Sequence, residues 1–262
     1  MLRFIADPLA DPPAFQVVPA TSDAAVLIAC DHASAVIPSR LGDLGLAEQT
    51  RQAHVAWDIG AAKVATALAG HLGCAAVLAG ISRLVIDCNR QPGDPSSIPA
   101  CTCGVPVPGN LGLDDAEAEA RAEAWFWPYH RELGTHLARA LRHGQVPAMV
   151  SVHSFTPNMG EYPRPWHVGV LWNRDGRMAL PVLDALRRVS GLCVGDNQPY
   201  SGREINYTLD THAGAAGLPH VSFEIRQDLL ADDEGCRRWG ALLAQVLVPV
   251  LANPDLRRVQ VF

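Results

Sequence analysis

Residues 26–34 read VLIACDHAS, an apolar run followed at once by an aspartate and His32. A second run, AMVSVHSF at residues 148–155, carries His153 directly after another apolar segment. Short continuous apolar runs are typical of strands that are buried on both faces, as in a parallel sheet. The sequence therefore predicts strands at 26–30 and 148–152. Both histidines then lie at the carboxyl ends of strands, where open α/β sheets bind their ligands.

Apolar periodicity predicts the remaining elements in alternation. Further strands are expected at 75–78, 84–87, 167–172 and 220–225, and helices at about 50–72, 114–144, 177–189 and 233–251. Strands that alternate with helices predict an α/β fold, a three-layer α/β/α sandwich with a mixed, mostly parallel central sheet. No repeat or linker divides the sequence, so a single domain over residues 1–262 is expected. Residues 89–112 are dense in Pro, Gly, Ser and Cys and predict a long loop, of the kind that is usually functional or mobile.

Composition excludes several classes of protein. The formal net charge of −6 does not fit the basic surface of a nucleic-acid-binding protein. Asp7 and Pro8 interrupt the first apolar residues, which argues against a signal peptide, and the apolar stretch 241–252 is too short to span a bilayer. Seven cysteines without a C-x-x-C pair indicate neither a disulfide framework nor a structural zinc site. We expect a cytoplasmic protein with a small anionic substrate, no nucleic-acid or membrane partner, and an oligomeric state that the sequence leaves open.

Acidic residues complete a candidate metal site around the two histidines. A catalytic zinc takes three protein ligands, commonly imidazole and carboxylate, and keeps one position open. Asp58 is the expected third ligand beside His32 and His153, and His54, one helical turn earlier, is the alternative. Glu224 ends an apolar strand, where a carboxylate is costly unless it is paired or used, and we expect it to act as general base.

Arginines near the predicted strand at 84–87 form a candidate anion pocket. Arg83, Asn89 and Arg90 flank this strand, and such donors can hold a carboxylate or face a developing oxyanion. Arg164 and Tyr200, both in Pro-containing loops, are expected to join the pocket.

Structural roles are the alternative for each of these residues. The histidines can cap strands through backbone carbonyls, the arginines can form local ion pairs, and Glu224 can pair with Arg226. Several candidates at neighbouring strand ends favour a shared site over separate structural roles.

Seven segments together resemble the N-formylglutamate amidohydrolase family, which is related to the zinc-dependent exopeptidases and carboxypeptidases. The resemblance covers about residues 26–251, and its most specific segments are 30–34, 54–60, 82–90, 153–157, 164–170, 196–200 and 224–228. It implies a zinc-exopeptidase-like (phosphorylase/hydrolase-like) fold and a Zn²⁺ cofactor. It also implies hydrolysis of N-formyl-L-glutamate to formate and L-glutamate, a late step of one route of histidine degradation.

The resemblance to zinc carboxypeptidases also implies roles for single residues. His32 and His153 would bind zinc, Glu224 would take a proton from the attacking water, and Arg83 would polarise the scissile carbonyl. The Asn89–Arg90 pair would hold the substrate carboxylate.

Two departures from these relatives affect the ligand set and the substrate. Carboxypeptidases take a ligand from a Glu three residues after the first histidine, and Ala35 stands there in this chain, so Asp58 is the expected substitute. Gln198 stands where close relatives are expected to have Glu.

Two alternatives for the function stay open. A zinc hydrolase of the same fold can act on another N-acyl amino acid or on a short peptide. A non-catalytic module can bind an anionic metabolite through the arginines. Imidazole and carboxylate ligands also suit divalent ions other than zinc.

Overall fold

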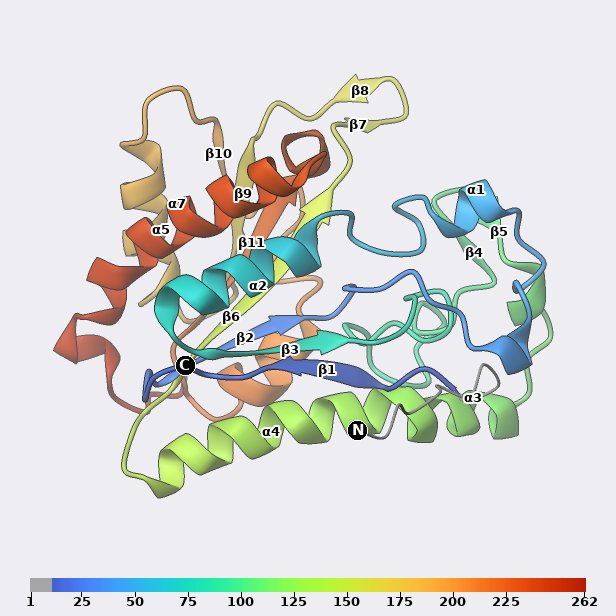
Figure 1. The fold of residues 1–262 in the computed structure, drawn as a ribbon, viewed down its shortest axis with the longest axis horizontal. Coiled ribbons are helices and arrows are strands. Elements are labelled where there is room, and N and C mark those ends of the chain that lie inside the picture. The colour runs from blue at the N-terminus through green and yellow to red at the C-terminus, as the bar shows by residue number, and fades with distance from the viewer. Residues whose placement is uncertain (1–10) are drawn as a thin grey trace, which may run out of the picture.

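The central sheet has seven strands in the order β1-β3-β2-β6-β11-β9-β10 (Figure 1). The computed structural model describes residues 11–262, so most of the stretch tested for a signal peptide lies outside the described residues. The strands are β1 (Phe15–Val18), β2 (Val26–Cys30), β3 (Ala75–Ala79), β6 (Ala148–Phe155), β9 (Val168–Leu171), β10 (Val194–Asp196) and β11 (His220–Arg226). Two small hairpins, β4 (Cys101–Thr102) with β5 (Val105–Pro106) and β7 (Asn158–Met159) with β8 (Tyr162–Pro163), lie outside this sheet.

Four neighbouring strands, β3, β2, β6 and β11, run parallel to one another. Strand β1 is antiparallel to β3, and β9 is antiparallel to β11. The edge strand β10 is parallel to β9. The prediction of a mixed, mostly parallel sheet is therefore confirmed, although the sequence did not reveal the short edge strands β1 and β10.

Helices cover both faces of the sheet. They are α1 (Glu48–Arg51), α2 (Ala61–Leu72), α3 (Asp115–Arg121), α4 (Trp127–Arg142), α5 (Ala179–Arg187), α6 (Tyr207–Leu209) and α7 (Asp233–Leu251). Helices α2, α5 and α7 pack on one face and α4 on the other, which confirms the three layers (Figure 1). In β2, Ile28 faces the first of these layers and Leu27 the second, so the strand is apolar on both sides. Within residues 11–262, no helix combines the length and apolar character that crossing a bilayer requires.

The helix expected from Asp114 is present with a change of pitch. Asp114 caps the helix by accepting a hydrogen bond from the Glu117 backbone N–H (2.8 Å). A π-helical turn, η3 (Ala122–Phe126), then joins α3 to α4 just before Pro128. The predicted helix therefore forms over most of its length, with a change of pitch in its middle.

The prediction of one helix over residues 50–72 is wrong, because the structure has two helices, α1 and α2, with turns between them. Gly60 ends the break with a φ of 82°, and a Cβ there would lie 2.5 Å from the Cβ of Leu230. Within the break, the Asp58 backbone N–H donates to the carbonyl oxygen of His32 (2.9 Å). The segment therefore bends to bring Asp58 to the end of β2.

The prediction of a strand at 84–87 is also wrong, because this segment forms a series of turns. The Asp87 carboxylate accepts a hydrogen bond from the Asn89 backbone N–H (2.8 Å) and pairs with Arg83 (2.9 Å). These short-range bonds favour a curled backbone over an extended one. The apolar residues of the segment are buried with Trp125 in a cluster apart from the main core.

Candidate active site

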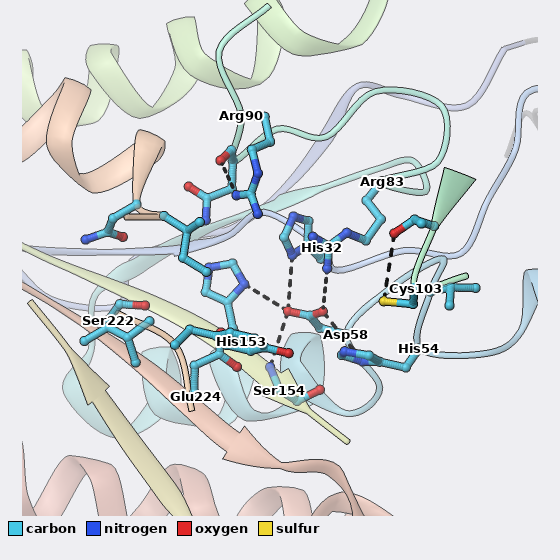
Figure 2. A pocket seen from close by; sticks show the side chains of 17 residues that line it. His32, His54, Asp58, Arg83, Arg90, Cys103, His153, Ser154, Ser222 and Glu224 are labelled. Carbon is cyan, nitrogen blue, oxygen red and sulfur yellow. Dashed lines mark hydrogen bonds and ion pairs between the residues drawn. The ribbon is translucent and has the colours of Figure 1, made fainter. Parts of the chain in front are cut away.

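A cavity of about 210 Å³ collects most of the predicted site residues (Figure 2). It lies at the carboxyl ends of β2, β6 and β11, in the place that the α/β topology favours for a ligand. The predicted residues that line it are His32, Asp58, Arg83, Asn89, Arg90, His153, Tyr200 and Glu224. Its volume suits a ligand smaller than those held in pockets of roughly 300–1,000 Å³.

His32, Asp58 and His153 form a buried cluster that could hold a metal ion, with one ligand atom of each within 4.8 Å of the others. The Asp58 Oδ2 atom lies 3.2 Å from His32 Nδ1 and 2.9 Å from His153 Nδ1 (Figure 2). His153 lies inside β6 instead of just after the predicted strand, and His32 lies two residues beyond β2. The cluster contains Asp58 and not His54, whose Nδ1 is 3.9 Å from Asp58 Oδ1.

Two further carboxylates hold the outer nitrogens of these imidazoles. His32 Nε2 lies 2.7 Å from Asp87 Oδ1, and His153 Nε2 lies 3.2 Å from Asp31 Oδ2. Asp31 is fixed in turn by the Tyr129 hydroxyl, which donates to its Oδ1 (2.8 Å). Carboxylates in this position orient metal-binding histidines, direct their inner nitrogens to the metal and raise their basicity. Neither Asp31 nor Asp87 was expected to have this role from its place in the sequence.

The charges of the cluster also suit a divalent cation. Burial and Arg83 lower the pKa of His32, but Asp87 and Asp58 outweigh them and the pKa stands above its usual value. Burial likewise lowers the pKa of His153, which Asp31 and Asp58 raise to well above the usual range. The carboxylates thus draw protons onto both imidazoles, and a divalent ion can take the place of those protons. Among the described residues, the buried Asp58 Oδ1 atom has no hydrogen-bond partner; Arg83 lies 3.5 Å from it as an ion-pair partner, and it can still accept a bond from a ligand.

Replacing Asp87 with Asn is expected to weaken metal affinity by about 10- to 100-fold, because His32 loses the carboxylate that orients it. Competition with a chromophoric chelator measures this affinity. Asp94→Asn is the control, since the exposed Asp94 carboxylate bonds locally to Ser96 and does not contact either histidine of the cluster among residues 11–262. Equal affinities of D87N and the unmutated protein would contradict the orienting role.

Glu224 lies in β11 directly opposite His153 in β6. Its side chain is buried, and its Oε2 atom has no hydrogen-bond partner in the part of the chain that the structure describes. Burial raises the pKa of Glu224 to about 7, although the nearby His153 acts to lower it. A carboxyl that titrates near neutrality can both accept and return a proton. The alternative pairing with Arg226 is wrong, because that guanidinium binds Asp228 (2.8 Å).

The two arginines beside the cavity have different surroundings. Arg83 pairs with Asp87 (2.9 Å) and approaches Asp58 Oδ1 (3.5 Å). Arg90 donates to the carbonyl oxygen of Asn89 (2.9 Å) and, within residues 11–262, has no carboxylate within 4.0 Å. Arg90 is therefore the cation that is available to an anionic ligand.

Arg164 lies behind Tyr200 instead of on the cavity wall. Its guanidinium is 5.0 Å from the Tyr200 ring centroid and donates to Thr156 Oγ1 (3.2 Å). Tyr200 lines the cavity, so Arg164 supports the wall that Tyr200 forms. The long loop expected at 89–112 contributes to another wall through Thr102 and Cys103.

The fold and the cavity together define an α/β protein with the features of a hydrolase: a candidate metal-binding cluster, a buried carboxyl group and a free arginine. The family model of N-formylglutamate amidohydrolase matches residues 24–231. The chain belongs to the N-formylglutamate amidohydrolase family, and the predicted resemblance is confirmed.

Solved structures with the same fold are found among known proteins. The chain is similar to the gene product Atu2144 of Agrobacterium tumefaciens, with 35% identity, a TM-score of 0.88, and coverage of 92% of this chain and 95% of that one. It also shares the fold of N-formylglutamate amidohydrolase from Ralstonia eutropha JMP134, with 21% identity, a TM-score of 0.62, and coverage of 92% and 97%. A comparison with curated proteins gives no significant match.

Proposed function

We propose that this chain is a zinc-dependent amidohydrolase that cleaves N-formyl-L-glutamate to formate and L-glutamate, in a cytoplasmic route of histidine degradation. One observation carries the hydrolytic part of the proposal. Glu224, a buried carboxyl group with a free oxygen, lines the same cavity as the cluster of His32, Asp58 and His153. Membership of the N-formylglutamate amidohydrolase family supports the choice of substrate.

The donor set of the cluster fits zinc, which binds imidazole nitrogen and carboxylate oxygen. His32 and His153 would hold it through the Nδ1 atoms that face Asp58, and Asp58 through a carboxylate oxygen. When bound, Zn²⁺ supplies a Lewis acid that polarises a carbonyl oxygen and makes water a stronger nucleophile at neutral pH.

The side chains around the cluster supply the proton transfers and the contacts with substrate. Glu224 takes the proton of the attacking water and returns it to the departing amine, for which a pKa of about 7 is well suited. Arg83 lies beside Asp58 and faces the oxyanion that develops on the formyl oxygen. Arg90 and Asn89 hold a substrate carboxylate, and Tyr200, supported by Arg164, forms the wall beside them.

A panel of N-formyl, N-acetyl and N-succinyl amino acids, each with glutamate and with a neutral side chain, tests the substrate. The expected result is the highest kcat/KM for N-formyl-L-glutamate. A higher value for another N-acyl amino acid would keep the chemistry and replace the substrate. Binding of anions without hydrolysis of any member, in zinc-loaded protein, would favour a non-catalytic binding module.

A further inference from the structure

Buried polar atoms without hydrogen-bond partners are concentrated around the cavity. Among the described residues there are six such side-chain atoms, and four of them belong to residues that line it. Three of the four are on His54, Asp58 and Glu224, which lie at the candidate metal cluster or beside it. The fourth is Asn206 Nδ2, which the proposed reaction does not use.

Asn206 occupies a position where asparagine usually has a structural role. It is the N-cap residue of α6, and an N-cap asparagine normally accepts a hydrogen bond from a backbone N–H two or three residues later. Here the side chain makes no such bond. The Thr208 N–H donates instead to Asn89 Oδ1 (3.0 Å), from a distant segment of the chain. Asn89 has therefore taken over the capping, and the side chain of Asn206 is left free.

The same hydrogen bond places Asn206 beside the arginine wall of the cavity. It ties the start of α6 to Asn89, the residue directly before Arg90, and all three of Asn89, Arg90 and Asn206 line the cavity. Arg90 carries a positive charge without a carboxylate partner among the described residues, and Asn206 carries an amide donor without an acceptor. Asn206 is only 5% exposed, so water does not readily satisfy this donor. A buried donor without a partner is costly, which makes an acceptor on a ligand the expected partner.

We propose that Asn206 binds the substrate, with its Nδ2 and the Arg90 guanidinium donating to the same carboxylate of the amino-acid half. This inference rests on the proposed function for the identity of that half, which is L-glutamate. A neutral donor next to a guanidinium holds one carboxylate oxygen while the cation neutralises the charge. Asn206 thereby contributes to the selection of N-acyl amino acids over neutral N-acyl amines.

Substitutions at Asn206 separate this role from a structural one. N206A is expected to raise KM for N-formyl-L-glutamate, and the Kd of L-glutamate measured by calorimetry, by about 10- to 100-fold, the usual effect of one hydrogen bond to a charged group. The value of kcat should change little, because the contact forms equally in the ground state and the transition state. N206D keeps the shape of the side chain but adds a negative charge, so a Kd at least about 100-fold weaker is expected.

Asn253 offers a matched control. It is the N-cap residue of η6 (Pro254–Leu256), and, unlike Asn206, its side chain accepts a hydrogen bond from the Asp255 N–H (3.0 Å). N253A should lower Tm and leave KM unchanged, whereas N206A should leave Tm unchanged and raise KM. If N206A does not fold, the Kd of N206D provides the test.

The outcomes for Asn206 and for the proposed reaction differ. A Kd for L-glutamate within twofold of the unmutated protein in N206A and N206D overturns the role of Asn206, whatever the activity. A failure of the unmutated protein to bind L-glutamate or any N-acyl amino acid of the panel overturns it as well. Binding that weakens in N206A, in a protein that releases no formate, supports the role of Asn206 and refutes the proposed reaction.

Discussion

Replacing Glu224 with Gln is expected to lower kcat by roughly 10²- to 10⁴-fold, the usual contribution of a general acid–base residue. Gln keeps the size of the side chain but cannot take a proton from water. The metal content should not change, because Glu224 is not a member of the cluster of His32, Asp58 and His153. Initial rates of formate release, together with metal analysis of the same samples, measure both quantities.

The matched control for E224Q is Glu132→Gln on α4, where the carboxylate forms a surface ion pair with His136 (3.2 Å). E132Q should keep full activity. Turnover by E224Q within about tenfold of the unmutated protein would rule out Glu224 as the general base. A loss of metal in E224Q would instead identify Glu224 as a ligand.

Replacing Asp58 with Ala is expected to weaken metal affinity by more than about 100-fold, beyond the effect of losing an orienting carboxylate. Asp58 Oδ2 is the atom that lies against both imidazoles, and without it two histidines remain. Turnover should fall together with the bound metal. Metal analysis after dialysis against buffered zinc measures the loss, and circular dichroism confirms that the variant is folded.

His54→Ala is the comparison that decides between the two candidate third ligands. Its Nδ1 lies outside the cluster, so H54A should retain its metal. Retained metal in D58A, combined with loss of metal in H54A, would exchange the roles of the two residues.

The main elements of the fold could be predicted because their signals are local. The run at 26–30 is apolar throughout, and the run at 220–225 has an apolar residue at every second position, since both strands are buried. The helix predicted at 233–251 has the bounds of α7. The two wrong predictions, a continuous helix over 50–72 and a strand at 84–87, arose because residues 52–60 and 84–87 are apolar enough to look regular. Their backbones follow the contacts of Asp58 and Asp87 with His32, which depend on tertiary structure.

The same reason explains which parts of the candidate site were missed. His32, Asp58 and His153 have side chains whose chemistry suggests a ligand, so they could be chosen by residue type and by their places near strand ends. Asp31 follows β2, which lies next to β6 in the sheet, but Asp31 and His153 are far apart in the sequence, so nothing close to either residue indicates their contact. Asn206 looks like an ordinary helix cap, and only the hydrogen bond that Asn89 makes in its place shows that its side chain is free.

The decisive measurement is formate release from N-formyl-L-glutamate before chelation, after chelation and after zinc is restored. The proposed function predicts release that the chelator abolishes and zinc restores, because the cluster of His32, Asp58 and His153 supplies the metal site. No release by folded, zinc-loaded protein would contradict the proposed substrate, and release that withstands complete removal of metal would contradict the proposed chemistry.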